Sequence, residues 1–203
     1  MGICYIVGAG DCKSLDFEKK TDDMIIAADG GYKYLLSANI KPDIIIGDFD
    51  SLGEIPQEKN IIKLNPVKDI TDMNAAVNIG MDKGYSEFVL YGALGGRLDH
   101  SLANIQLVAG LSKDGKKASI RDSKTFITAV TNGSISFDSS YKGFISVFSH
   151  SDECENVSIR GLKYTLENST LRNLFSLGVS NEFIGSESEI IIGNGTAVII
   201  CCG

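Results

Sequence analysis

Short runs of almost wholly apolar residues recur through the first part of this chain, and they limit its fold more than any other feature. We predict strands at Ile3 to Val7, Met24 to Ala28, Asp43 to Ile46, Ile61 to Leu64 and Phe88 to Tyr91. Strands that are apolar along their whole length are typical of a parallel sheet covered on both faces. Apolar residues at helical spacing separate them, over Met73 to Met81 and over Leu98 to Ala109. The pattern predicts an α/β domain with a mainly parallel sheet.

The pattern of apolar and polar residues changes beyond residue 122. Short strand-like runs are separated there by Gly, Ser, Asn and Asp, and no helical period is evident. The runs Glu189 to Ile192 and Thr196 to Cys202 flank Gly193-Asn194-Gly195, which we interpret as the turn of a β-hairpin. We therefore predict an α/β domain over residues 1–122 and an antiparallel β-sandwich over residues 123–203.

The composition is that of a folded protein and excludes some classes of partner. Hydrophobic residues make up 43% of the 203 residues and charged residues 22%, which is ordinary for a globular chain. A net charge of -7 without a basic stretch argues against nucleic-acid binding. No apolar run approaches the ~20 residues of a membrane span, and the N-terminus lacks the basic start of a signal peptide. The five cysteines form no C-x-x-C pair, which favours a reducing compartment, so we expect a cytoplasmic protein.

Two acidic residues follow the third apolar run. If the backbone stays extended, Asp48 and Asp50 project to the same side of it. Two such carboxylates provide half of a site for Mg²⁺, which takes its other ligands from water and phosphate. The alternative is that Asp48, Asp50 and Ser51 are ordinary turn formers that bind loop amides.

A second cluster precedes the first predicted helix. Asp69, Thr71 and Asp72 stand at its start, and simple N-capping accounts for one of them. A helix N-terminus also attracts anions, and Lys68 strengthens this attraction. A phosphate group can bind at this position beside a carboxylate-bound cation, but the cluster taken alone favours a structural role.

The most specific cluster follows the fifth apolar run. Gly95-Gly96 provides a backbone that can curl around phosphate oxygens, and Arg97 carries a guanidinium suited to bidentate contact with phosphate. Asp99 is either a further carboxylate of the site or a helix cap. His100 is interpreted as a side chain packed on its neighbours rather than a catalytic base.

Two other glycine-containing segments are weaker signals. Gly8-Ala9-Gly10 follows the first strand, but Lys13 stands where a dinucleotide-binding G-x-G-x-x-G motif requires its third glycine. Asp29-Gly30-Gly31 after the second strand predicts a sharp turn that can approach a nucleotide. Ligands collect at the carboxyl ends of strands in an open α/β sheet, so the acidic clusters together predict one magnesium-dependent phosphate site there.

These motifs, in their order along the chain, resemble those of the thiamin pyrophosphokinase family. The resemblance rests on Asp29-Gly30-Gly31, Pro42-Asp43, Gly47-Asp48-Phe49-Asp50-Ser51, Asp69-x-Thr71-Asp72 and Gly92-x-x-Gly95-Gly96-Arg97-x-Asp99-His100. It extends into the second domain through Gly161-Leu162-Lys163-Tyr164 and Ser180-Asn181. Tyr164 stands where some members of the family carry Trp, and either ring can stack on a pyrimidine.

The resemblance implies an α/β domain that binds MgATP, a β-sandwich that binds thiamine, and a homodimer with thiamine between the subunits. It implies Asp48, Asp50 and Asp72 as metal ligands and, together with Asp99, as catalytic residues. The implied ATP and phosphate contacts are Asp29, Gly30, Lys68, Thr71, Gly95, Gly96 and Arg97. The implied thiamine contacts are Tyr164, Ser180 and Asn181.

The implied reaction moves the diphosphoryl group of ATP to the hydroxyethyl oxygen of thiamine and releases AMP. Either Asp72 or Asp99 can accept the hydroxyl proton, and the sequence does not choose between them. One alternative is a diphosphotransferase that acts on another alcohol, such as a hydroxymethyl pterin. Others are a protein that senses ATP without turning it over and a metal-dependent phosphohydrolase.

Overall fold

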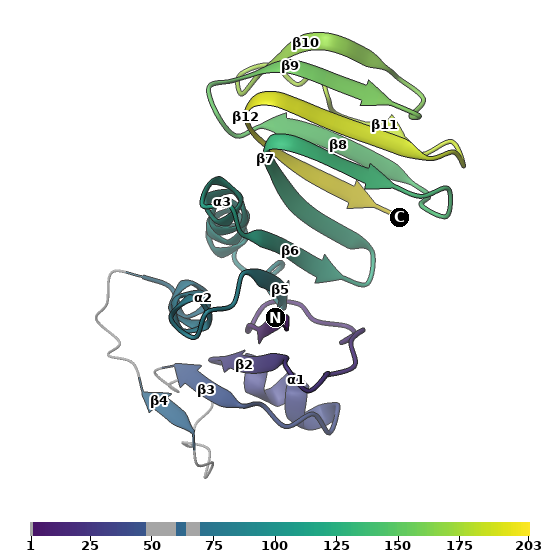
Figure 1. Ribbon diagram of the computed structural model, residues 1–203. Coiled ribbons are helices and arrows are strands. Elements are labelled where there is room, and N and C mark those ends of the chain that lie inside the picture. The colour runs from purple at the N-terminus through teal and green to yellow at the C-terminus, as the bar shows by residue number, and fades with distance from the viewer. Residues whose placement is uncertain (1, 48–59, 64–69) are drawn as a thin grey trace. The chain divides into compact units, whose positions relative to one another are not determined.

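The structure is a computed structural model that describes residues 2–47, 60–63 and 70–203 (Figure 1). The chain forms two compact units, Met1–Leu107 with Ile120–Ser123 and Val108–Ser119 with Lys124–Gly203. The domain boundary predicted between residues 122 and 123 stays a prediction.

The first unit is built on a parallel sheet. Its strands are β1 (Cys4–Val7), β2 (Met24–Ala28), β3 (Ile44–Gly47), β4 (Ile61–Lys63) and β5 (Glu87–Tyr91), in the spatial order β4-β3-β2-β1-β5. Cys4 pairs in register with Met24 on one side and with Phe88 on the other. Almost every residue of β1, β2, β3 and β5 is buried, which explains the continuous apolar runs in the sequence. The predicted α/β fold with parallel strands is confirmed.

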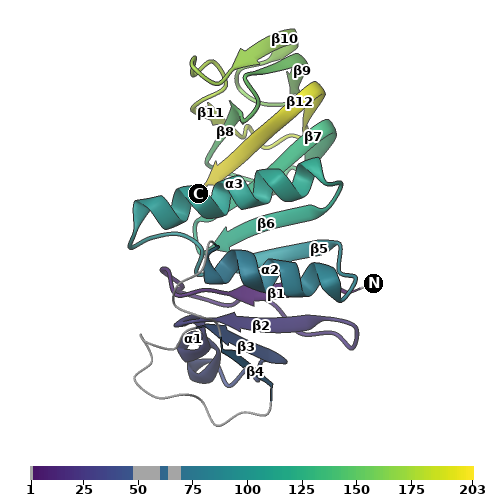
Figure 2. The same cartoon turned by 90° about the vertical axis from the view of Figure 1, so that its left-hand side faces the viewer.

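Helices lie on both faces of this sheet (Figure 2). They are α1 (Gly31–Ser37), α2 (Asp72–Asp82) and α3 (Leu98–Lys113). Leu35 of α1 packs in a core with Tyr5 and Val7. Gly80 of α2 lies against Phe88 and Cys4, where an added Cβ would stand 2.7 Å from the Phe88 ring. Successive strand residues point to opposite faces, so α1 and α2 cover opposite faces of β1.

The second unit is mainly antiparallel. The strand β6 (Lys117–Asp122) follows α3 and is divided between the two units. The strands that come after it belong to the second unit: β7 (Thr125–Phe137), β8 (Phe144–Ser149), β9 (Glu153–Arg160), β10 (Leu166–Arg172), β11 (Asn181–Glu182) and β12 (Ser188–Cys202). The long strand β12 pairs antiparallel with β7, β8 and β9. Inward-facing residues of these strands, among them Ile145, Ile159 and Ile199, form one buried core. The prediction of an antiparallel C-terminal region is confirmed.

The predicted hairpin at residues 193–195 is wrong. Those residues lie inside β12 and form a register shift between Ile192 and Thr196 instead of a turn. Gly195 adopts φ +105°, and its N–H donates to Oδ1 of Asn132 on β7 at 2.8 Å. Before the shift β12 pairs with β9 and after it with β8, so a glycine-containing bulge lets one strand change partners.

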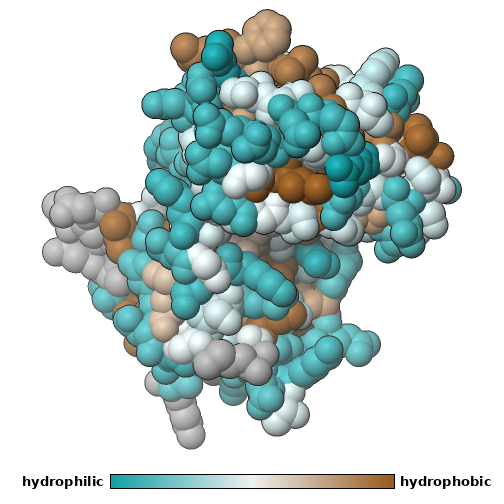
Figure 3. Space-filling view, turned by 45° about the horizontal axis from the view of Figure 1, so that its top comes forward, coloured by the Kyte–Doolittle hydropathy of each residue, from teal (hydrophilic) through white to brown (hydrophobic). Residues whose placement is uncertain are grey.

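The surface that Figure 3 shows is covered mostly by hydrophilic side chains, with hydrophobic ones reaching it in separate patches. Among the described residues, no helix has the length and apolarity that crossing a membrane requires.

Candidate active site

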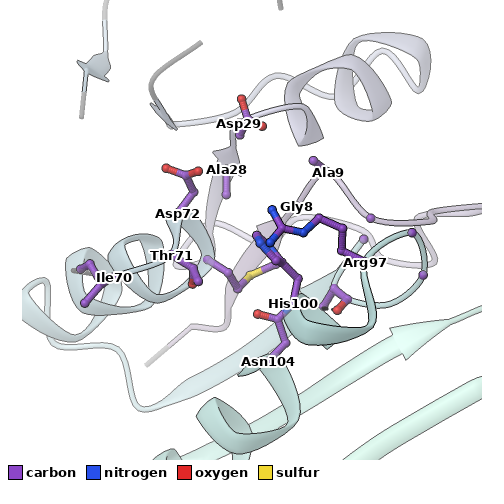
Figure 4. Close-up of a pocket in the computed structure, with 16 residues that line it drawn as sticks. Gly8, Ala9, Ala28, Asp29, Ile70, Thr71, Asp72, Arg97, His100 and Asn104 are labelled. Carbon is purple, nitrogen blue, oxygen red and sulfur yellow. Dashed lines mark hydrogen bonds between the residues drawn. The ribbon is translucent and has the colours of Figure 1, made fainter. Parts of the chain in front are cut away.

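A cavity of about 740 Å³ opens in the first unit, where the sheet strands end and two helices begin. Its lining comes from the loops after β1, β2 and β5, from the first turn of α2 and from the first two turns of α3 (Figure 4). Because parallel strands end at the same edge of a sheet, residues far apart in sequence meet there. The predicted position of the site, at the carboxyl edge of the sheet, is where this cavity lies.

Two of the loops around the cavity are paired with each other. The N–H of Gly10 donates to the carbonyl of Gly92, and the N–H of Asp11 donates to that of Leu94, at 2.8 and 2.7 Å. A Cβ added at Gly8 would stand 2.8 Å from the Gly92 oxygen, closer than side-chain carbons come. The absence of a side chain at Gly8 therefore permits the close approach of the two loops.

The predicted glycine pair follows in the second of these loops. Gly95 and Gly96 both line the cavity and adopt φ +83° and φ +60°, which are left-handed conformations that other residues rarely take. Gly95 also lies directly against Asp11, whose carboxylate occupies the place that a Cβ would need. The backbone is thus open toward the cavity at the position expected to receive phosphate.

Acidic and hydroxyl side chains form another wall. Thr71 is the N-cap of α2, and its Oγ1 accepts a hydrogen bond from the N–H of Asn74 at 3.2 Å. Asp72 stands in the first helical turn, and Asp29 follows β2 in a left-handed conformation with φ +48°. The carboxylates of Asp29 and Asp72 lie on the same side of the cavity (Figure 4). A non-glycine residue held in this conformation is a typical feature of functional sites.

Arg97 and His100 reach the cavity from α3 and the residue before it. The Arg97 guanidinium binds both carboxylate oxygens of Asp99, at 3.2 Å through Nε and 2.5 Å through Nη2. This hydrogen bonding holds the pKa of Asp99 below its usual value and raises the pKa of Arg97. Asp99 is not among the lining residues, and neither is Gly30, the N-cap of α1.

The predicted residues Asp48, Asp50 and Lys68 lie outside the described residues. Gly47 at the end of β3 is described, and a Cβ added there would stand 3.1 Å from Cα of Asp29. Within the described ranges, no three His, Cys, Asp or Glu side chains gather closely enough to hold a metal ion. Asp29 and Asp72 nevertheless supply carboxylate oxygens, which are the ligand atoms that Mg²⁺ prefers. The chemical type of these side chains therefore fits a magnesium ion.

A smaller cavity of about 260 Å³ lies in the second unit and is lined in part by Tyr164, Leu166 and Asn181. Tyr164 is 59% exposed, whereas Asn181 is 5% exposed. Ser180, the third predicted thiamine contact, adopts φ +61° and is not in the lining. Its N–H donates to Oγ of Ser146 at 3.1 Å.

Several lining residues were not predicted as site residues. Gly8, Ala9 and Gly10 line the cavity although they complete no known phosphate motif. Their signal is their position directly after the first strand. Asn104 lies seven residues after Arg97, which is about two helical turns and therefore the same face of α3. Nothing else in the sequence distinguishes it.

The cavity at the carboxyl edge of the parallel sheet combines glycine loops, a helix N-terminus and a guanidinium. These features are typical of α/β proteins that bind phosphorylated ligands. Residues 16–120 match the catalytic domain of thiamin pyrophosphokinase, and residues 132–198 match its vitamin B1 binding domain. The chain therefore belongs to the thiamin pyrophosphokinase family. Its activity is that of a thiamine diphosphokinase with ATP and thiamine as substrates, and the expected family and reaction are confirmed.

Individual relatives are similar over nearly the whole chain. The thiamine pyrophosphokinase of Bacillus subtilis (strain 168) is 31% identical over 204 residues, which cover 95% of each chain. The crystal structure of thiamine pyrophosphokinase from Bacillus subtilis superposes with a TM-score of 0.87 at 26% identity and covers 100% of this chain and 99% of that one. That of thiamin pyrophosphokinase from Geobacillus thermodenitrificans gives 0.84 at 28% identity, with 99% and 97% covered.

Proposed function

We propose that the larger cavity holds the phosphates of ATP and that diphosphoryl transfer takes place in it. The observation that carries this proposal is the convergence of two glycine loops, the N-terminus of α2 and Arg97 on one cavity. Each of these features favours anions, because left-handed glycines open the backbone and a helix N-terminus carries partial positive charge. Positioning and charge stabilisation contribute most of the catalysis in phosphoryl transfer, and these residues supply both.

Asp72, together with Asp48 and Asp50, would hold Mg²⁺ next to the phosphates. When bound, the ion neutralises charge on the phosphate oxygens. Asp29 stands on the same side of the cavity as Asp72 and adds a further carboxylate there. Lys68, Gly30 and Asp99 remain proposed contacts of the same site.

In the transfer step, the hydroxyethyl oxygen of thiamine forms a bond to the β-phosphorus of ATP. The bond from that phosphorus to the oxygen bridging it to the α-phosphorus breaks, and AMP leaves with the electron pair. The hydroxyl proton passes to a carboxylate. Asp72 lines the cavity whereas Asp99 binds Arg97 outside the lining, which favours Asp72 as the acceptor. Arg97 would stabilise the negative charge that develops on the phosphates.

Thiamine would bind in the second unit, with its pyrimidine ring stacked on Tyr164. The ring of Tyr164 is largely exposed, and its backbone is fixed by the buried Asn181, so a flat surface is presented on a rigid support. Ser180 is placed beside these residues by its position in the chain. Stacking on a heteroaromatic ring contributes on the order of 1 kcal/mol beyond the burial of its area.

A homodimer in which each site uses both subunits is the remaining part of the proposal. The inactive variant Asp72→Asn and the thiamine-binding variant Tyr164→Ala are mixed, dissociated and reassociated, and activity is measured at a low thiamine concentration, where Tyr164→Ala alone is slow. Shared sites would restore up to about a quarter of the wild-type activity, because half of the random dimers are mixed and each of them regains one intact site. If each subunit holds a complete site, the activity does not rise above that of the Tyr164→Ala protein in the mixture. A monomeric mass by light scattering would also refute the dimer.

The first test of the function is to incubate the purified protein with magnesium, ATP and thiamine and to separate the products by chromatography. We expect thiamine diphosphate and AMP in equal amounts. AMP or phosphate formed without thiamine diphosphate would instead indicate hydrolysis. A hydroxymethyl pterin serves as the control acceptor, and its conversion in place of thiamine would refute the proposed acceptor.

A further inference from the structure

A buried amide on α3 holds the loop that follows β5. Asn104 is 7% exposed and lines the larger cavity. Its Nδ2 donates a hydrogen bond of 2.7 Å to the carbonyl oxygen of Ala93. Ala93 is itself 3% exposed, so its carbonyl has little access to water and depends on a protein donor. This hydrogen bond connects the second turn of α3 to the loop.

The same loop is held from the other side by backbone hydrogen bonds. The carbonyls of Gly92 and Leu94 accept the N–H groups of Gly10 and Asp11. The carbonyl of Ala93, between them, accepts the hydrogen bond from Asn104 on α3 and not one from the β1 loop. The loop is therefore clamped between the β1 loop and Asn104, directly before the left-handed Gly95 and Gly96.

The orientation of the Asn104 amide is fixed by chemistry. Only its nitrogen can donate to a carbonyl oxygen, because Oδ1 in that place would oppose another acceptor. Among the described residues, the buried side-chain atoms that lack a hydrogen-bond partner are the hydroxyls of Tyr91 and Ser188. Oδ1 of Asn104 is not one of them, and the residue lines the cavity (Figure 4).

We propose that Asn104 is the positioning residue of the phosphate-binding loop: by holding the Ala93 carbonyl, it sets the place at which Gly95, Gly96 and Arg97 meet the phosphates of ATP. The proposal rests on the proposed function of this cavity. An amide suits the position because it supplies a donor without charge. A carboxylate would repel both the Ala93 carbonyl and the phosphates, and an aliphatic side chain would leave the carbonyl unpaired.

The test uses two substitutions at this position and a matched control. Asn104→Leu removes the donor at similar size, and Asn104→Asp keeps the shape but has no donor. Gln106→Leu makes the same amide-to-aliphatic change at an exposed position of α3 outside the cavity lining. We expect kcat/KM for ATP to fall roughly 10- to 100-fold in both Asn104 variants, as displacement by about 1 Å does in other sites. KM for thiamine should stay within about twofold, and Gln106→Leu should match the wild type.

A purely structural role predicts a different result. The melting temperature and the fraction of active enzyme would fall, while kcat per active site and KM for ATP would stay at their wild-type values. That outcome would overturn the proposal. Asn104→Asp serves if Asn104→Leu does not fold, because it preserves the volume of the side chain.

Amide hydrogen exchange at Gly95 and Gly96 gives a readout that needs no turnover. We expect faster exchange there in Asn104→Asp and unchanged exchange in Gln106→Leu, and equal rates in all forms would contradict the proposal. If the wild type and Gln106→Leu both fail to make thiamine diphosphate, the proposed function fails. The positioning role is then still decided by the exchange rates.

Discussion

The side-chain amide of Asn181 forms two hydrogen bonds with the backbone of Tyr164. Its Oδ1 accepts the Tyr164 N–H at 2.9 Å, and its Nδ2 donates to the Tyr164 carbonyl at 2.6 Å. The amide acts as a neighbouring strand would, but through a side chain. A buried residue thus fixes the backbone that carries an exposed aromatic ring.

Replacing Asn181 with Ala should weaken thiamine binding without affecting ATP. Two backbone groups of Tyr164 lose their partners, so the ring is no longer held in one place. We expect KM for thiamine to rise roughly tenfold and the free energy of unfolding to fall by about 1–3 kcal/mol. Steady-state kinetics and urea denaturation measure the two effects. Asn173→Ala, at an exposed position of the same unit, is the control, and an unchanged KM for thiamine in Asn181→Ala would refute the assignment.

Substitution of Asp72 with Asn should abolish turnover while the protein stays folded. The carboxylate lies at the wall of the cavity in the first turn of α2, so the amide removes a negative charge needed there but keeps its shape. We expect kcat to fall by about 100-fold or more, as for a positioned acid–base group. Asp82→Asn at the other end of α2 is the control. Near-normal activity in Asp72→Asn would remove this residue from the proposed site.

Two glycine-to-alanine changes should have opposite effects. A Cβ at Gly8 would stand 2.6 Å from Cε of Met73 and 2.8 Å from the Gly92 oxygen, so Gly8→Ala must push the paired loops apart. A Cβ at Gly110 would meet nothing within 4 Å, and Gly110 lies inside α3. We expect Gly8→Ala to lower both stability and activity, and Gly110→Ala to stabilise by about 0.5–1 kcal/mol. Thermal unfolding tests both, and a more stable Gly8→Ala would contradict the tight packing of the loops.

The thiols should differ sharply in reactivity. Burial raises the pKa of Cys4 and of Cys201 to about 12, and Cys154 is fully buried, whereas Cys202 is exposed and Cys12 partly so. The thiolate is the reactive form, so a thiol reagent at pH 8 should modify Cys202 first and Cys12 more slowly. The other three should react only after unfolding. Mass spectrometry of modified peptides identifies the sites, and rapid labelling of Cys4 in the folded protein would refute the burial.

The same shifts predict how stability depends on pH. The folded pKa values of Cys4 and Cys201 are raised above the ~8.5 of an unfolded thiol, so the folded state binds more protons than the unfolded state at alkaline pH. The stability that these two thiols contribute is fully present below about pH 8.5 and is lost as the pH rises toward about 12. Urea denaturation should give a falling free energy of unfolding over this interval. A double Cys4→Ala, Cys201→Ala variant should show a smaller slope.

Most of the first unit could be predicted from the sequence because its strands are buried on both faces and therefore apolar throughout. The short helix α1 was missed, since it spans only Gly31–Ser37 and its N-cap Gly30 supplies no side-chain hydrogen bond. The Gly193-Asn194-Gly195 segment satisfies the local rules for a turn. Its actual form depends on Asn132, far away in the sequence, which no local pattern reveals.

The site residues that can be recognised from a single segment of the sequence could be predicted. Gly95, Gly96, Arg97, Thr71 and Asp72 are recognisable from their positions at a strand end or a helix start, and all of them line one cavity. Hydrogen bonding between two loops cannot be inferred from the sequence of either loop alone. For this reason Gly8 and Gly10 were not predicted as site residues. Asn104 was missed for a related reason, because its partner is a backbone carbonyl and any residue at position 93 would supply one.

The pairing of β12 with three other strands also governs when the second unit can form. The strands β7, β8 and β9 all pair with β12, and these contacts join residues widely separated along the chain. During synthesis, none of the three completes its pairing before residues 188–202 have been made. The nascent second unit therefore carries open strand edges until β12 has been made, when the strands of the parallel sheet have already been available.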